Sequence, residues 1–239
     1  MRAVVLAAGR GERLGAATQK RPKPLWRLGS APILDQDLAL LWAAGISHVA
    51  INLHHLGSAI RDNVDQQHYG TMSITYSEEE TLLGTAGGVR KAQSLLPSTW
   101  PLLVIYGDNL LRLDLRRMME AHTGAKGLAS IAVHWLADAR MSGLIEFSRE
   151  GRIDSFVEKP QSSRPIPGWV NAGVYLLEES VIDTIPADRP TDFGLDIFPG
   201  LLRRQANLYA HKLGAGESVW AIDTPERYAE AVRSVARQA

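Results

Sequence analysis

Short apolar runs alternate with segments of helical periodicity along the first half of the chain. An uninterrupted apolar run of five or six residues is typical of a strand buried on both faces of a parallel sheet. Residues 33–44 instead place apolar side chains at helical spacing and end before Gly45, a residue type that often follows the last helical turn. The predicted order is strand 3–8, helix 33–44, strand 49–53, helix 58–64, strand 73–76, helix 87–95 and strand 102–106.

In the second half of the chain, predicted strands follow one another. They lie at 130–135, 143–147, 153–158 and 170–177, before a closing helix at 228–237. Glu150-Gly151-Arg152 predicts a hairpin turn, and the Ser- and Pro-rich segment 162–168 predicts a loop. The whole pattern predicts an α/β fold. We expect a Rossmann-like, mostly parallel central sheet with helices on both faces, and a small mixed β insertion that binds substrate, within one domain of residues 1–239.

Composition narrows the classes of partner. The 239 residues include 26 Lys and Arg against 26 Asp and Glu, so a broad basic surface for nucleic acid is not expected. The chain has no cysteine, which excludes disulfides and cysteine-bound metals. No apolar run approaches 18 residues and no signal peptide is seen, so we expect a cytoplasmic protein with no membrane partner. Assembly into a homo-oligomer stays open.

The first apolar run leads directly into a glycine-rich, basic loop. Gly9 and Gly11 let the backbone approach a ligand. Arg13 follows in the same loop, and Lys23 follows in the next basic segment. Backbone N–H groups beside such cations form an anion site, which suggests a nucleoside triphosphate. The loop is neither a Walker loop nor G-x-G-x-x-G, because Leu14 stands at the third glycine position. An ordinary strand–loop–helix start with solvated charges is the other interpretation.

The run L-A-A-G-R-G-E-R-L at 6–14, followed by P-K-P-L at 22–25, resembles the opening motif of the sugar-1-phosphate nucleotidyltransferases, or NDP-sugar pyrophosphorylases. That family transfers a nucleotidyl group from an NTP to a sugar 1-phosphate and releases pyrophosphate. The resemblance implies that the catalytic residues are Arg13, which holds the β- and γ-phosphates, and Lys23, which contacts the α-phosphate. It also implies a nucleotide-binding half, residues 1–110, and a sugar-phosphate-binding half, residues 111–239.

A second segment resembles the family's nucleotide site. The sequence G-T-A-G-G at 84–88 matches the pattern G-T-A-G-[GA], in which small residues let the nucleobase and ribose lie against the backbone. The same residues also suit a helix N-terminus. The resemblance implies these nucleotide-binding residues: Leu6, Ala7, Ala8, Gly9, Gly11, Gly84, Thr85 and Ala86.

Two aspartates are the expected ligands of a Mg²⁺ cofactor. Asp108 follows the run 102–106, and ligands bind beyond the carboxyl ends of strands in open α/β sheets. The family's second metal aspartate most often stands where this chain has Ala221, and the nearest carboxylate is Asp223. Related cytidylyltransferases carry an I-D-[ST] version of this motif. For both aspartates the alternative is a helix cap, in the case of Asp223 on the closing helix.

Two later segments, V-E-K-P at 157–160 and V-N-A-G-V-Y at 170–175, resemble the sugar-phosphate half of the family's site. A lysine can neutralise the phosphate, whereas carboxylate and amide groups suit hydroxyls. Glu158 and Lys159 alone also fit a surface ion pair. Ser142 stands where the family usually has Tyr. The implied sugar-phosphate-binding residues are Asn109, Gly143, Glu158, Lys159 and Asn171.

The segment T-D-F-G-L-D-I-F-P at 191–199 also resembles a family segment, and a structural role for Asp192 and Asp196 stays open beside a ligand role. Taken together, the motifs look most like guanylyltransferases that use GTP and a mannose- or heptose-type 1-phosphate. Uridylyl- and thymidylyltransferases on another sugar 1-phosphate stay open, as does a cytidylyltransferase for a phosphorylated amino alcohol. A non-catalytic sugar-nucleotide sensor is opposed by the presence of Arg13, Lys23 and Asp108.

Overall fold

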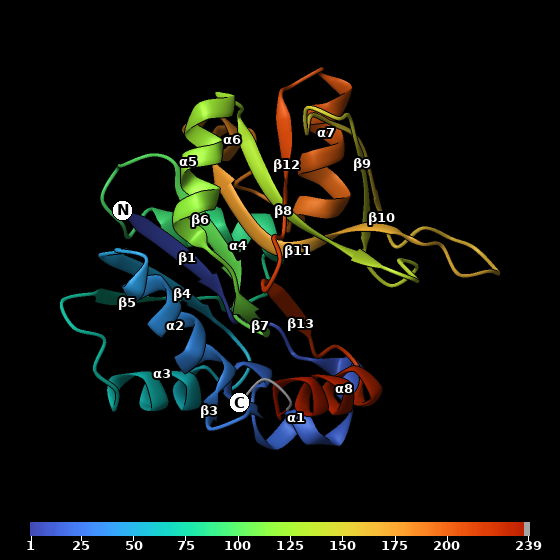
Figure 1. Cartoon of the computed structure of the whole chain (residues 1–239). Coiled ribbons are helices and arrows are strands. Elements are labelled where there is room, and N and C mark those ends of the chain that lie inside the picture. Colours follow the sequence, from blue (N-terminus) through green and yellow to red (C-terminus); the bar gives the residue numbers. More distant parts are fainter. Residues whose placement is uncertain (237–239) are drawn as a thin grey trace.

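The computed structural model describes residues 1–236, except for the side chains of Arg13, Ala16 and Ala17. Its first half forms the predicted parallel sheet, with β1 (Arg2–Leu6) between β4 (His48–Leu53) and β6 (Leu102–Tyr106), and with β5 (Ser73–Glu78) beyond β4. Figure 1 shows β1 beside β4 and β6, and in their register Val4 lies between Ala50 and Val104. The carboxyl ends of β1, β4 and β6 therefore meet at one edge of the sheet.

The second half extends this sheet with antiparallel strands. β11 (Gly168–Leu177) pairs antiparallel with β6 and joins the two halves. It also pairs with β8 (Ala129–Leu136) and β9 (Gly143–Phe147), β10 (Ile153–Glu158) forms the predicted hairpin with β9, and β12 (Leu208–Lys212) lies parallel to β8. Within residues 1–236 the sheet has nine strands. The mixed β addition that the sequence predicts is thus continuous with the central sheet.

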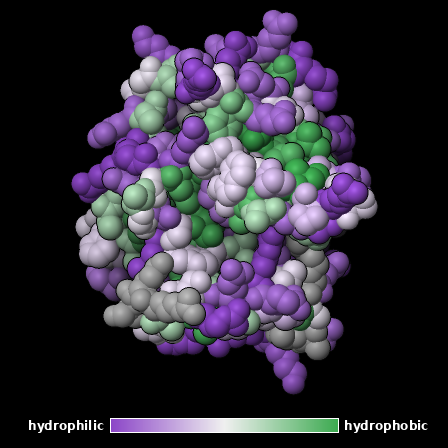
Figure 2. Space-filling model, turned by 45° about the vertical axis from the view of Figure 1, so that its right-hand side comes forward, coloured by the Kyte–Doolittle hydropathy of each residue, from purple (hydrophilic) through white to green (hydrophobic). Residues whose placement is uncertain are grey.

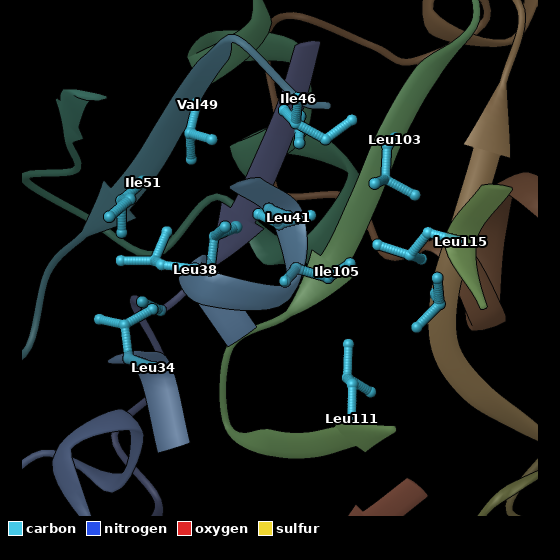
Figure 3. Close-up of a cluster of buried hydrophobic side chains, with 14 of the residues drawn as sticks. Leu34, Leu38, Leu41, Ile46, Val49, Ile51, Leu103, Ile105, Leu111 and Leu115 are labelled. Atoms are coloured by element: carbon cyan, nitrogen blue, oxygen red, sulfur yellow. The ribbon is translucent and has the colours of Figure 1, made fainter. Parts of the chain in front are cut away.

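Helices cover both faces of the sheet, as predicted. One face packs against α2 (Ile33–Ala43), α3 (Gly57–Asp65) and α5 (Leu115–Ala125), and the other against α4 (Gly84–Gln93), α6 (Glu179–Asp183) and α7 (Phe198–Arg203). Alternation along a strand divides the side chains, so that Val5 belongs to the first core and Val4 to the second. In Figure 3, Leu34, Leu38 and Leu41 of α2 lie against Val49, Ile51, Leu103 and Ile105 of the strands. Burying each such side chain contributes roughly 1.5–3 kcal/mol.

A separate two-stranded sheet brings the end of the chain back to the parallel strands. β13 (Ser218–Ala221) pairs antiparallel with β7 (Asn109–Arg112), and this register places Ala221 opposite Asn109. α8 (Pro225–Ala236) follows and packs near another short hairpin, β2 (Arg27–Leu28) with β3 (Ala31–Pro32). The remaining short elements are α1 (Ala16–Lys20), 3₁₀ turns at Glu12–Leu14 and Lys23–Leu25, and a π-helical turn at Phe193–Ile197.

Some boundaries differ from those predicted. The first strand ends at Leu6, because the amides of Ala7 and Ala8 donate to the Asn52 side chain rather than to a neighbouring strand. The helix predicted at 87–95 begins earlier, at Gly84, and the closing helix begins at Pro225, whereas position 237 of that prediction lies outside the described residues. The segment 162–168 is a loop up to β11, as predicted.

Hydrophilic residues cover most of the face shown in Figure 2, and hydrophobic residues appear between them in patches. The exposed large hydrophobic side chains include Trp135, Met141 and Leu195. None of the helices in the described part of the chain combines the length and the apolar character that crossing a bilayer requires.

Candidate functional site

Two adjoining cavities open at the carboxyl ends of the parallel strands, where the sequence places a ligand site. The first has a volume of about 280 Å³ and the second of about 440 Å³. Thr85, Tyr106, Asp108 and Asp192 line both cavities. The two spaces therefore form one continuous site with Asp108 in the shared wall.

The first cavity contains most of the predicted nucleotide-binding residues. Leu6, Ala7, Ala8, Gly9, Gly84 and Thr85 line it together with Lys23 and Asp108. Gly11 and Ala86 do not line either cavity. Gly11 turns the loop with a φ of 62°, and a side chain there would meet Thr18. Ala86 is fully buried, and its amide donates to the Thr191 carbonyl at 2.9 Å. Gly11 and Ala86 therefore support the backbone around the first cavity without lining it.

Asn52 and Glu79 form a hydrogen-bonded pair in the wall of the first cavity, and the sequence did not predict either residue. The Asn52 Oδ1 atom accepts from the amides of Ala7 at 2.6 Å and Ala8 at 3.3 Å, and its Nδ2 donates to Glu79 Oε1 at 2.7 Å. Glu79 Oε2 accepts from the Leu83 amide at 2.9 Å. Gly88 of α4 allows this close packing, because a Cβ there would lie 2.6 Å from Asn52 Nδ2. The signal in the sequence was one polar residue, Asn52, within the otherwise apolar run 49–53.

Lys23 links the two predicted metal ligands. Its Nζ lies 2.8 Å from Asp108 Oδ2 and 3.0 Å from Asp223 Oδ1, and the residue is only 4% exposed. Burial alone would lower the pKa of Lys23, but the two carboxylates outweigh it and raise that pKa above its ordinary value. Lys23 is therefore charged at neutral pH, and its ammonium group holds both carboxylates in one place.

Asp223 and Thr224 stand side by side immediately before α8. Thr224 caps α8, since its Oγ1 accepts from the Arg227 amide at 3.3 Å and its carbonyl accepts from the Tyr228 amide at 2.9 Å. Asp223, the residue before it, faces Lys23 through Oδ1, at 3.0 Å, and Arg227 through Oδ2, at 3.4 Å. The Asp223 carboxylate therefore lies beside Lys23, although Ala221 stands where the family usually has its second metal aspartate, and the metal-binding role of Asp223 stays a prediction.

The donor set fits a magnesium ion that is also bound by substrate phosphates. Mg²⁺ keeps several waters and is commonly bound through one or two carboxylates plus phosphate oxygens. Asp108 and Asp223 supply two carboxylates around a space where a cationic group, the Lys23 ammonium, is already accommodated. Among the described residues no group of three or more acidic or histidine side chains could hold a metal by itself.

The second cavity contains all five predicted sugar-phosphate residues: Asn109, Gly143, Glu158, Lys159 and Asn171. Lys159 Nζ lies 3.8 Å from Glu158 Oε1, and about half of the lysine side chain is exposed. Asn171 lies in β11 at a point where the pairing with β8 changes register, between Asn171 and Tyr175. Its Nδ2 donates to the Tyr175 hydroxyl at 2.7 Å, and its Oδ1 accepts from the Gly173 amide at 2.9 Å.

Asp192 lies in the wall between the cavities and also has a structural role. It caps the π-helical turn by accepting from the Gly194 amide at 2.8 Å, and it accepts from the Thr85 hydroxyl at 2.8 Å. Arg13, the other predicted catalytic residue, has its backbone in the Glu12–Leu14 turn, and its side chain lies outside the described atoms.

His134 and Arg227 are further residues of the second cavity that the sequence did not single out. Burial, with a smaller contribution from the Arg227 charge, lowers the pKa of His134 to about 4. His134 is therefore a neutral imidazole at pH 7, able to donate and to accept a hydrogen bond.

Known proteins of similar sequence show the family of this chain. The chain matches the family described as Nucleotidyl transferase over residues 2–231. It is 32% identical to a UTP–glucose-1-phosphate uridylyltransferase of Synechocystis sp., over 88% of this chain and 57% of that protein. It is 31% identical to a mannose-1-phosphate guanylyltransferase of Mycobacterium tuberculosis, over 98% of this chain and 65% of that protein. The chain thus spans less than two thirds of these relatives.

Solved structures share the fold over the whole chain. HddC from Yersinia pseudotuberculosis superposes with a TM-score of 0.81 at 23% identity, covering 98% of both chains. A UDP-glucose pyrophosphorylase in complex with UDP-glucose superposes with a TM-score of 0.84 at 17% identity, covering 100% of this chain and 99% of that one. The chain belongs to the nucleotidyl transferase family, as the opening motif predicted.

Proposed function

We propose that this protein transfers a nucleotidyl group from an NTP to a sugar 1-phosphate and releases pyrophosphate. The observation that carries this proposal is the contact between the two cavities, where Lys23 of the first cavity lies between Asp108, which lines both, and Asp223 of the second. A triphosphate in the first cavity and a sugar phosphate in the second would meet at this wall. The relatives named for guanylyl and uridylyl transfer support the same reaction class.

The reaction needs no protein nucleophile, because the attacking phosphate is already anionic. A sugar phosphate oxygen forms a bond to the α-phosphorus, and the bond from this phosphorus to the oxygen that bridges to the β-phosphate breaks. Lys23, fixed by its two carboxylate partners, offsets charge at the α-phosphate, and Arg13 is assigned to the departing β- and γ-phosphates. Catalysis then comes from positioning and from preorganised charge.

Asp108 and Asp223 are the residues proposed to hold Mg²⁺. When bound, the metal neutralises phosphate charge. On the other side, Lys159 is assigned to the phosphate of the sugar 1-phosphate, and Glu158, Asn109 and Asn171 are assigned to the sugar. Asn171 is well suited to this role because Tyr175 and Gly173 already fix its side-chain orientation.

Glu79 favours GTP as the nucleotide. Glu79 lines the first cavity, and each oxygen of its carboxylate already accepts one hydrogen bond from the protein. A carboxylate has about four lone-pair sites, so each oxygen can accept one bond more. Guanine presents two neighbouring donors, N1–H and N2–H, which match two acceptors, whereas uracil and thymine present a single N3–H between two carbonyls. We therefore propose GTP with a mannose- or heptose-type 1-phosphate.

A substrate panel tests this proposal. Pyrophosphate release should be measured with GTP, UTP, dTTP and CTP, each with mannose, glucose and heptose 1-phosphates and with a phosphorylated amino alcohol. We expect GTP with a mannose- or heptose-type phosphate to give the highest kcat/KM. Preference for UTP or dTTP would overturn the base assignment, and activity confined to CTP with the amino alcohol phosphate would overturn the sugar assignment.

A further inference from the structure

Arg227 occupies a defined place at the edge of the second cavity. It lies one helical turn after Asp223, and its Nη1 atom is 3.4 Å from Asp223 Oδ2. The other oxygen of the same carboxylate faces Lys23. Asp223 is therefore held between two cations, one from each end of the chain.

The charge balance of the second cavity calls for a cation at this place. Its lining includes five carboxylates, those of Asp108, Glu158, Asp192, Asp223 and Glu230. Among the described residues only Lys159 and Arg227 line it with Lys or Arg side chains. Lys159 is 51% exposed and lies beside Glu158, whereas the Arg227 side chain is 27% exposed. Lys23 partly neutralises Asp108 and Asp223, but a sugar phosphate dianion that met Lys159 alone would still face the carboxylates of Glu158, Asp192 and Glu230.

We infer that Arg227 binds the phosphate of the sugar 1-phosphate and at the same time holds Asp223 in place. This inference rests on the proposed function. The guanidinium group is a rigid fork with five N–H donors, so it can donate to Asp223 from one nitrogen and to a phosphate from another. A lysine, as a single point charge, would not reproduce this double contact. Arg227 follows Asp223 by four residues, so the aspartate, which stands two positions after the family's usual one, is paired with an arginine of the same segment.

Three variants test the inference. Arg227→Gln removes the charge, Arg227→Lys keeps the charge but loses the fork, and Arg233→Gln is the matched control on the exposed side of the same helix. KM for both substrates and kcat should be measured, and the affinity for mannose 1-phosphate should be measured directly by calorimetry. Melting temperatures of the three variants report on folding.

We expect Arg227→Gln to raise KM and Kd for the sugar 1-phosphate at least tenfold, with KM for the triphosphate changed less than threefold. Arg227→Lys should recover part of this loss, and Arg233→Gln should match the wild type. An unchanged Kd for mannose 1-phosphate in Arg227→Gln would overturn the inference, as would a loss confined to kcat, which would leave Arg227 acting only through Asp223.

Direct binding also separates this inference from the proposed function. If the wild type binds mannose 1-phosphate and Arg227→Gln does not, the inference holds even when no nucleotidyl transfer is detected, and the proposed function alone fails. If the wild type is active while Arg227→Gln binds the sugar phosphate normally, the proposed function stands and the inference fails. A wild type that binds no sugar phosphate overturns both.

Discussion

Lys23 and Asp223 are separated by 200 positions in the sequence, yet the lysine Nζ lies 3.0 Å from the aspartate Oδ1. The contact depends on β13, which pairs with β7 and so returns the end of the chain to Asp108. The site is therefore closed by a segment distant from the glycine-rich loop. A substitution at Asp223 should therefore change the position and charge environment of Lys23, a proposed catalytic residue near the start of the sequence.

Replacing Asp223 by Asn should abolish most activity with a smaller loss of fold stability than Lys23→Met, because Lys23 keeps Asp108 as a carboxylate partner. Asn is a neutral and weaker metal ligand, so we expect a strong fall in kcat and a raised Mg²⁺ requirement. Thr224→Ala is the control, because Thr224 caps α8 and its loss should cost about 1 kcal/mol of stability without loss of activity. Kinetics at varied Mg²⁺ and thermal unfolding check both variants. Wild-type kinetics in Asp223→Asn would remove this residue from the metal site.

Replacing Lys23 by Met should lower turnover by about 30- to 1,000-fold, which corresponds to losing a charge worth roughly 2–4 kcal/mol at the reacting phosphate. The buried position adds a second effect: without the ammonium group, Asp108 and Asp223 face each other, so the variant should melt at a lower temperature. Mg²⁺ alone should then raise the melting temperature more in Lys23→Met than in the wild type. A turnover loss under fivefold, or an equal response to Mg²⁺, would contradict this account.

Glu79→Gln tests the choice of nucleobase. An amide offers one acceptor oxygen where the carboxylate offers two, so the variant cannot serve Asn52, Leu83 and two guanine donors together. We expect the ratio of kcat/KM for GTP to that for UTP to fall at least tenfold. Glu80→Gln, at the exposed neighbouring position, should leave the ratio unchanged. The base assignment is wrong if both variants keep the wild-type ratio.

The parallel half of the fold was predictable because its strands are apolar runs and its helices have apolar periodicity. β7, β12 and β13 were not predicted: β7 and β13 have only four residues each, and β12, of sequence L-Y-A-H-K, has no uninterrupted apolar run. The site shows the same limit. Motifs predicted Lys23, Asp108 and Asn171, whereas Asn52, Glu79 and Arg227 became candidates only when the fold brought them together. A single polar residue at the end of a strand has no spacing rule that would identify it.

His134 should make stability depend on pH. Its pKa is lowered to about 4 in the folded protein from an ordinary value of 6.5, so between these values the unfolded chain binds a proton that the folded protein does not. The stability that neutral His134 contributes is fully present above pH 6.5 and is lost as the pH falls toward 4. Between pH 7.5 and pH 5 the free energy of unfolding should fall by about 2 kcal/mol on this account. Urea unfolding at both pH values measures this. Between pH 7.5 and pH 5, the free energy of unfolding should fall by about 2 kcal/mol less in His134→Gln than in the wild type. Equal losses in the two proteins would contradict the lowered pKa.

Following labelled phosphorus through the reaction tests the central claim most directly. The purified protein should be incubated with Mg²⁺, mannose 1-phosphate and GTP that carries ³²P at either the α- or the γ-position. The account predicts that α-label appears in a GDP-sugar, that γ-label appears in pyrophosphate, and that the two products form in equal amounts and only when the sugar phosphate is present. Triphosphate and sugar phosphate that bind but yield neither product, with every base and sugar tried, would contradict it and identify a sensor instead of a transferase.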